Sequence, residues 1–144
     1  MKLYEMASYL NDIKHDLSIQ SAPVFHHLVK YFYIEDYELR DHWAHEIYSF
    51  LNDVDLVKGK NKFPKCDFIM KNTYDTHADS ILLKKPHILQ SYRKNHIIKN
   101  IEDDKFMAFC KEYFERISYL LSMYGFVNEE TIRLILEDAS QKYS

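Results

Sequence analysis

The sequence predicts an all-α, single-domain helical bundle of about five to seven helices, and three observations carry this prediction. The 144 residues include only two Gly and three Pro, which leaves little scope for tight β-hairpins or phosphate-cradling glycine loops. Apolar residues recur at steps of three and four along several segments, as in helices with one buried face. The chain is 47% hydrophobic and 28% charged, the balance of a folded protein with a core. One domain over residues 1–144 is the simplest division of this length.

The amino-terminal part predicts three helices. The first, over residues 3–18, carries its apolar stripe at Leu3, Met6, Leu10, Ile13 and Leu17. Pro23 suits the first turn of a second helix, which we expect to end near Tyr33. Glu35 and Asp36 place negative charge at the start of a third helix, which the helix dipole favours, and this helix should reach Leu51.

The middle of the chain predicts a long connection with shorter helices. Residues 58–65 contain a Gly and a Pro and are typical of a loop, residues 66–74 predict a short helix, and another should end at Lys85. Pro86 is expected to separate it from a further, basic helix. The apolar residues of that further helix are Ile88, Leu89, Tyr92, Ile97 and Ile98.

The clearest helical period begins at Asp103 or Asp104 and continues to about Tyr124. Gly125 then provides a stop, since glycine readily adopts the left-handed conformation that ends helices. Asn128 is expected to cap a last helix. The buried stripe of that helix is predicted at Ile132, Ile135 and Leu136.

Composition also excludes several classes of protein. Charges at Glu5 and Asp12 interrupt the amino terminus, and no charge-free apolar run reaches 18 residues, so we expect no signal peptide and no membrane span. Cys66 and Cys110 form no CxxC pair, which argues against a disulfide framework and a structural zinc site. These features predict a cytoplasmic protein that needs no metal or cofactor.

The net charge of −3 hides a division along the chain. Residues 1–56 hold 4 Lys/Arg and 10 Asp/Glu, residues 57–101 hold 10 and 3, and residues 102–144 hold 5 and 9. A basic middle between acidic ends indicates either a surface that binds a polyanion or charge complementarity within the protein or a dimer.

Residues 39–51 concentrate the polar groups that could support catalysis. On a helix Asp41 and His45 stand at i and i+4, so the carboxylate can reach a ring nitrogen, and Tyr48 borders the same face. His45 could act as general base or acid, and Arg40 could bind a phosphate bidentately. Arg40 lies about 140° round the helix from His45, so a joint site requires a distorted helix start or a second chain.

The segment Arg40-Asp41-His42-Trp43-Ala44-His45 resembles the R-polar-x-x-x-H signature of the HEPN superfamily, whose members are small all-α domains, many of them metal-independent ribonucleases that act as dimers. The resemblance covers about a dozen residues. It implies a homodimeric, metal-independent endoribonuclease that could serve as a toxin or phage-defence effector. Arg40 and His45 would then be the catalytic pair, Asp41 their polar partner and Tyr48 a neighbour.

An RNA substrate would find its cations in the basic middle of the chain. The predicted RNA-binding residues are Lys58, Lys60, Lys62, Lys65, Lys84, Lys85, Arg93, Lys94 and Lys99. Phe63 and Tyr92 are aromatic residues in this region that could stack on bases or pack in the core.

Three alternatives stay open. A metal site could use Glu38, His42, His45 and Glu46, which share one helix face, although no second helix offers a matching motif. A non-catalytic binding protein, such as an inhibitor or antitoxin-like protein, could act on a protein partner through acidic ends or an aromatic surface. Arg40 and Asp41 could also be a solvated pair at a helix start, with no chemical role.

Overall fold

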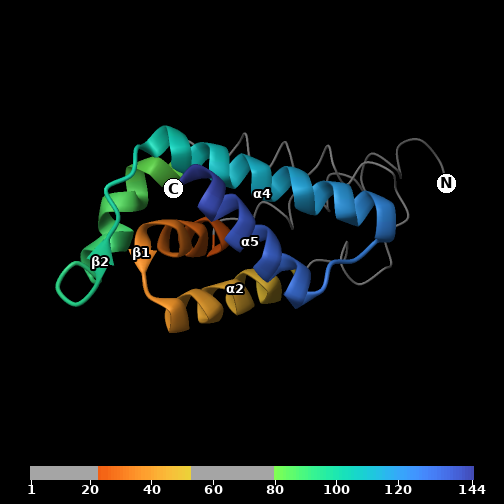
Figure 1. Ribbon diagram of the computed structural model, residues 1–144, viewed down its shortest axis with the longest axis horizontal. Helices are drawn as coiled ribbons and strands as arrows, with labels where there is room; N and C mark the ends of the chain where they lie inside the picture. Colours follow the sequence, from red (N-terminus) through yellow and green to blue (C-terminus); the bar gives the residue numbers. More distant parts are fainter. Residues whose placement is uncertain (1–22, 53–79) are drawn as a thin grey trace, which may run out of the picture.

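The computed structural model describes residues 23–52 and 80–144. These residues form five helical segments and one small antiparallel ribbon, which confirms the predicted all-α class (Figure 1). The helical segments are residues 23–33, α2 (Tyr37–Asn52), residues 80–90, α4 (Asp103–Tyr124) and α5 (Glu129–Tyr143). The predicted helices at residues 3–18 and 66–74 and the predicted loop at residues 58–65 lie outside the described residues.

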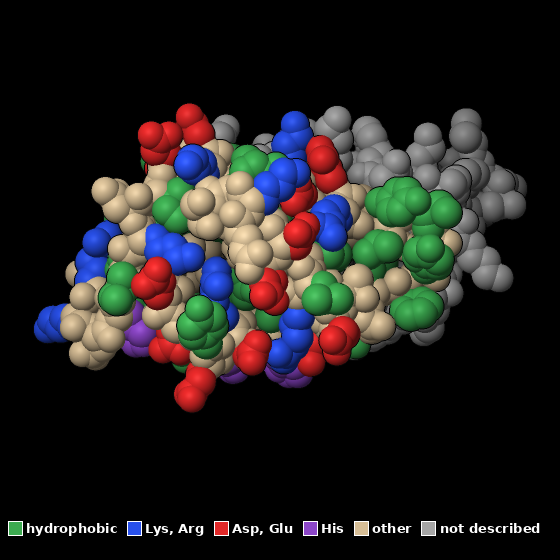
Figure 2. All heavy atoms as spheres, in the orientation of Figure 1, with side chains coloured by type: hydrophobic (Ala, Val, Ile, Leu, Met, Phe, Trp, Pro, Cys, Tyr) green, Lys and Arg blue, Asp and Glu red, His purple; other side chains and the backbone are tan. Residues whose placement is uncertain are grey.

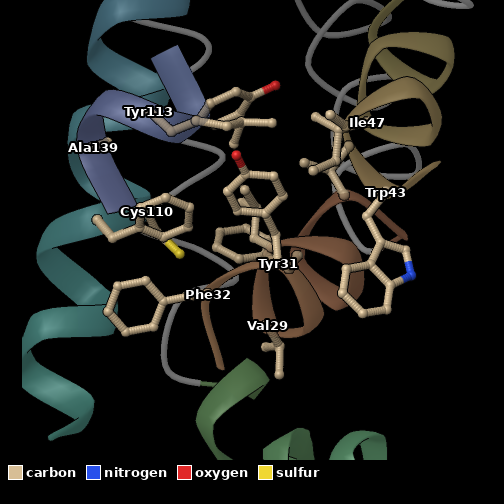
Figure 3. Close-up of a cluster of buried hydrophobic side chains, with 14 of the residues drawn as sticks. Val29, Tyr31, Phe32, Trp43, Ile47, Cys110, Tyr113 and Ala139 are labelled. Carbon is tan, nitrogen blue, oxygen red and sulfur yellow. The ribbon is translucent and has the colours of Figure 1, made fainter. Parts of the chain in front are cut away.

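The helix at residues 23–33 occupies the middle of the described structure, as its sequence requires. Its apolar residues surround the helix instead of following one stripe, and a helix of this kind must be covered on most sides. The buried members are Val24, Phe25, Leu28, Val29, Tyr31, Phe32 and Tyr33. The predicted helix from Pro23 to Tyr33 is therefore confirmed, and it supplies much of the core shown in Figure 3.

Aromatic rings join this central helix to α4. The rings of Phe32 and Phe109 have centroids 4.9 Å apart, and those of Phe25 and Phe114 lie 5.1 Å apart. Both pairs are tilted, the kind of arrangement that aromatic quadrupoles favour over a face-to-face sandwich. The aromatic residues of α4 recur at helical spacing because they pack on the aromatic residues of the central helix.

The connection from α4 to α5 follows the local signals in the sequence. Gly125 has φ 78° and ψ −7°, and its N–H donates to the carbonyl oxygen of Leu121 over 2.9 Å, which closes the last turn of α4. The side chain of Asn128 accepts the N–H of Thr131 over 2.8 Å and caps α5. The predicted bounds of both helices are confirmed.

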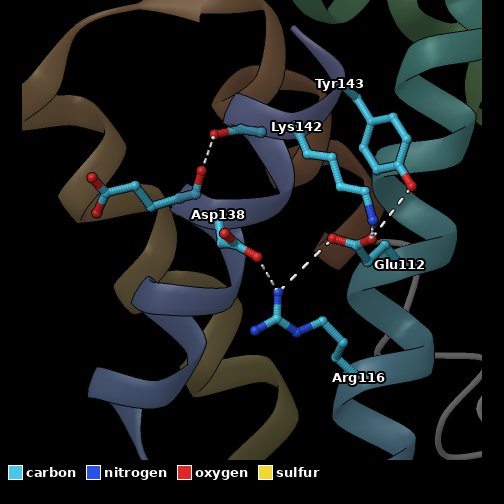
Figure 4. A network of polar contacts seen from close by, with 7 residues as sticks. Glu112, Arg116, Asp138, Lys142 and Tyr143 are labelled. Atoms are coloured by element: carbon cyan, nitrogen blue, oxygen red, sulfur yellow. Dashed lines mark hydrogen bonds and ion pairs between the residues drawn. The ribbon is translucent and has the colours of Figure 1, made fainter.

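The last helix, α5, packs against both α2 and α4 (Figure 1). Its buried residues include Ile132, Ile135 and Leu136, the predicted stripe. Polar residues also join α4 to α5, and we call them the α4–α5 polar network (Figure 4). The network consists of Glu112, Arg116, Asp138, Lys142 and Tyr143.

Two predictions for the middle of the chain are wrong. Residues 80–90 form one helical stretch that runs through Pro86, so this proline does not separate two helices. Ile97 and Ile98 are not helical but form strand β2 (Ile97–Ile98), which pairs with β1 (Ile34–Glu35). The ribbon is antiparallel, with Ile34 opposite Ile98. A pairing between residues 64 positions apart leaves no local sequence signal, and short apolar runs fit helix and strand alike.

The helices described here also bear on the membrane prediction. Among residues 23–52 and 80–144, none of the helices has the length and apolar character needed to cross a bilayer.

Candidate functional site

The predicted catalytic residues all lie on α2, whose start is fixed by Asp36. The Asp36 carboxylate accepts the N–H of Leu39 over 3.0 Å, and this bond satisfies one of the free donors at the helix start. Its other oxygen lies 3.3 Å from Nε2 of His96. The helix that presents Arg40 and His45 is therefore anchored immediately before its first turn.

Arg40 lies against the central helix, where two of its nitrogens are engaged. Its Nε donates to the carbonyl oxygen of Tyr31 over 3.1 Å, and its Nη2 donates to Oγ of Ser140 over 3.4 Å. The guanidinium also stands 4.5 Å from the centre of the Tyr31 ring, close enough for a cation–π interaction. These contacts hold the side chain in one place and occupy two of the five guanidinium N–H groups.

His45 is held by a residue from α5. Its Nδ1 contacts Oε1 of Glu129, and because a carboxylate only accepts hydrogen bonds, Nδ1 carries the proton. Nε2 of the ring is then the nitrogen that can exchange a proton with a substrate. The side chain of His45 is 53% exposed, so part of the ring is in contact with solvent.

Asp41 does not orient His45 as the spacing predicted, because each of the two side chains has its own partner on α5. Oδ1 of Asp41 lies 3.0 Å from Nη1 of Arg133. Arg133 in turn places Nη2 3.5 Å from Oε2 of Glu129, the carboxylate that holds His45. We call these four residues, Asp41, Arg133, Glu129 and His45, the α2–α5 polar chain.

In this single chain Arg40 and His45 do not meet. Arg40 contacts the central helix and Ser140, whereas His45 contacts the first turn of α5. This agrees with the angle of about 140° expected between positions five residues apart on a helix. Tyr48 is half-buried and packs against the hydrophobic core, on the side of α2 that contains Ile47.

The metal alternative finds no cluster of ligands in the described residues. His42 lies 3.9 Å from Glu46, and His45 turns to Glu129 instead of joining them. Within residues 23–52 and 80–144, no three His, Cys, Asp or Glu side chains come together in a way that could hold a metal ion. Cys110 is fully buried, and burial raises the pKa of its thiol, so it offers no reactive thiolate.

The predicted RNA-binding cations have different environments. Lys84, Arg93 and Lys94 are exposed. Nζ of Lys85 lies 2.5 Å from Oδ1 of Asp103 and 4.2 Å from the centre of the Tyr33 ring. Lys85 therefore links the helix at residues 80–90 to α4 and to the central helix. Its hydrogen bond lowers the pKa of the Asp103 carboxyl. Lys99 is half-buried, and the remaining four residues, Lys58, Lys60, Lys62 and Lys65, lie outside the described residues.

Positive charge also gathers around His26 on the central helix. Burial is the main cause of the lowered pKa of His26, and the charges of Lys84 and Lys30 lower it further. Nζ of Lys30 stands 5.8 Å from the centre of the Tyr92 ring, in the turn that contains Arg93. Lys84 of the basic middle and Lys30 of the amino-terminal part therefore both act on the same histidine.

The sequence did not indicate Glu129 and Arg133 as partners of the α2 residues. Their spacing of four along α5 predicts an ion pair on one helix face, and that pair is present. Their contacts with His45 and Asp41 span most of the chain, however, and no local pattern encodes such contacts. No family model, curated protein or solved structure matches this chain.

Proposed function

We propose that this protein is a metal-independent endoribonuclease in which His45 transfers protons, as its HEPN-like motif implies. The observation that supports the proposal is the His45–Glu129 contact. The contact with the carboxylate orients the ring through Nδ1, and the side chain of His45 is about half exposed. A base oriented by a carboxylate is the arrangement that proton-transfer catalysis requires.

The reaction would use the hydroxyl of the RNA itself. Nε2 of His45 takes the proton of a 2′-hydroxyl, whose oxygen then bonds to the adjacent phosphorus atom. The bond from phosphorus to the 5′-oxygen breaks, and the leaving oxygen takes a proton from water or from a protonated His45. The products are a 2′,3′-cyclic phosphate and a 5′-hydroxyl, and no metal takes part.

Arg40 has the role of phosphate ligand in this proposal, and its position makes a homodimer part of it. Because Arg40 and His45 turn to different neighbours in one chain, a site that contains both takes one from each protomer. The exposed cations of the chain, Lys84, Arg93 and Lys94, would attract the RNA backbone.

The test is cleavage of a mixed RNA pool by the purified protein in excess EDTA. Wild type should cut, and His45→Ala should lose about 100-fold or more of the rate, the usual contribution of a general acid or base. His42→Ala is the matched control, because His42 is an exposed histidine three residues earlier on α2. Absence of cleavage by wild type, or equal rates for the two variants, would refute the proposal.

A second candidate is a non-catalytic protein that binds another protein. It is favoured by apolar side chains that are exposed around the end of α4 and in the first half of α5 (Figure 2). The exposed members are Tyr119, Met123, Tyr124, Phe126 and Leu134, each 59–65% exposed. Patches of this kind commonly mark interaction sites. Full biological activity of an Arg40→Ala/His45→Ala double variant would favour this candidate over the nuclease.

A further inference from the structure

A cavity of about 330 Å³ opens at the start of α2, on the Arg40 side. One side of the cavity is formed where β1 leads into α2. The other side is formed by β2 and by Lys99, the residue after β2. The lining residues are Glu35, Asp36, Tyr37, Arg40, Ile97 and Lys99. His45 and Glu129 are not among them, so the cavity does not contain the proton-transfer pair of the same protomer. Its volume is at the lower end of the range for small-molecule sites.

Two half-buried cations line the cavity, and the fold holds both. Arg40 is fixed by Tyr31 and Ser140, as described above. Lys99 continues the β-ribbon, since its N–H donates to the carbonyl oxygen of Tyr33 over 2.7 Å. Burial is the main cause of the lowered pKa of Lys99, and the positive charge of Arg40 lowers it further. An anion between the two cations would relieve this repulsion.

The two carboxylates of the lining compete unequally for these cations. Asp36 already accepts the Leu39 N–H with one oxygen and faces His96 with the other. Glu35 is exposed, and its negative charge partly offsets the lowering of the Lys99 pKa. Glu35 is therefore the group that an incoming anion would displace from the neighbourhood of Lys99.

The remaining lining is apolar and unusually open to solvent. Tyr37 is 88% exposed and Ile97 is 67% exposed. Large apolar side chains are costly to leave in water, and here both stand beside two cations. A ligand that carries an anionic group next to a flat ring matches this combination of residues.

We propose that this cavity binds a nucleotide, with its phosphate between Arg40 and Lys99 and its base against Tyr37 and Ile97. Stacking on an aromatic side chain accepts any base, and the guanidinium with the ammonium binds the phosphate. This inference rests on the proposed function, in which Arg40 is a phosphate ligand. It adds that the phosphate belongs to a nucleotide bound in this cavity. The nucleotide is either free or part of an RNA strand, and the chemistry of recognition is the same.

The experiment is an NMR or calorimetric titration of the full chain with adenosine 5′-monophosphate, with adenosine as the ligand that lacks the phosphate. The nucleotide should bind and adenosine should bind at least about tenfold more weakly, because a charge-assisted hydrogen bond contributes more than that factor. Equal binding of both ligands, or no binding of the nucleotide, would overturn the proposal.

Four variants assign the binding to this cavity. Lys99→Met should weaken the binding of the nucleotide about tenfold, whereas Lys111→Met, which changes an exposed lysine of α4, should not. Tyr37→Ala should lower the affinity for the nucleotide about fivefold or more and leave the binding of inorganic phosphate unchanged. Glu35→Gln should raise the affinity for the nucleotide. Equal effects of the two lysine variants, or no effect of any variant, would contradict the assignment.

A further titration shows whether the ligand is a free nucleotide or part of a strand. A cleavage assay separates the nucleotide-binding proposal from the nuclease proposal. The trinucleotide ApApA without terminal phosphates should bind if the cavity accepts a strand, and only the free nucleotide should bind if it does not. Either result supports the cavity, whereas failure of both ligands refutes it. RNA cleavage by the wild-type protein is measured beside these titrations. If wild type does not cut RNA while the nucleotide binds, only the nuclease proposal fails.

Discussion

Two polar connections of α5, the α4–α5 polar network and the α2–α5 polar chain, differ in whether a mostly buried side chain stands at the centre. The α4–α5 polar network centres on Glu112, a 15%-exposed side chain that lies 2.6 Å from Lys142, 3.3 Å from the Tyr143 hydroxyl and 3.8 Å from Arg116. The α2–α5 polar chain has no such centre, and its end members Asp41 and His45 are 74% and 53% exposed. The first connection therefore has a mostly buried acceptor that should stabilise the fold, whereas every member of the second is about one-third exposed or more.

The largest expected contrast between the two connections is in RNA cleavage. Glu129→Gln keeps the shape of the side chain but removes the carboxylate that orients His45, so the cleavage rate should fall at least about tenfold. Asp138→Asn makes the same chemical change in the α4–α5 polar network and should leave the rate within about twofold of wild type. Single-turnover assays of both variants measure this contrast, and equal loss in both would remove the functional distinction.

Stability should show the opposite contrast. Glu112→Ala leaves the partners of a mostly buried carboxylate without an acceptor and should lower the free energy of unfolding by about 1–2 kcal/mol. Urea denaturation followed by circular dichroism measures the difference. Glu115→Ala, an exposed glutamate one turn further along α4, is the control and should lie within about 0.5 kcal/mol of wild type.

Acid sensitivity should come from the central helix instead of either polar connection. Burial lowers the pKa of His27 below its ordinary value of 6.5, although its Nδ1 donates to the carbonyl oxygen of Pro23 over 2.8 Å. The unfolded chain takes up this proton first as the pH falls, so stability present above pH 6.5 is lost between 6.5 and the lower folded pKa. His26, whose pKa is also lowered, contributes in the same direction.

The measurement is the free energy of unfolding at pH 7 and pH 5. His27→Gln should reduce the loss on acidification, whereas His87→Gln, an exposed residue of the helix at residues 80–90, should leave it unchanged. A loss that is identical in wild type and both variants would show that His27 does not contribute.

The smallest effect is expected for the outer pair of the α2–α5 polar chain. A double-mutant cycle on Asp41 and Arg133 should give a coupling of about 0.5 kcal/mol or less, the usual result for exposed ion pairs. A coupling above about 1.5 kcal/mol would show that this pair stabilises the fold, and the contrast between the two connections would then weaken.

The sequence predicted those helix ends that depend only on residues close by in the chain. The stop at Gly125 and the cap at Asn128 each depend on residues within four positions, and both were predicted correctly. The β2 residues were predicted wrongly because their structure depends on distant partners. Ile98 becomes a strand residue only when Ile34 lies beside it.

In the candidate site, too, features set by neighbouring residues were predicted and contacts with distant residues were not. The placement of Arg40 and His45 on one helix, facing different ways, follows from the helical repeat and was predicted. The partners of Asp41 and His45 were not, because an i, i+4 spacing allows a contact between them but cannot exclude stronger competitors on α5. The Arg40–Lys99 cavity was also beyond sequence reasoning, since it forms only where the ribbon brings the two cations together.

The 84 positions between His45 and Glu129 also set an order of events during translation. Ribosomes add roughly 5–20 residues per second, so α2 precedes its carboxylate partner by roughly 4–17 s. Throughout that interval the growing chain carries the histidine without the group that orients it. An activity that depends on the pair would begin only after α5 has left the ribosome.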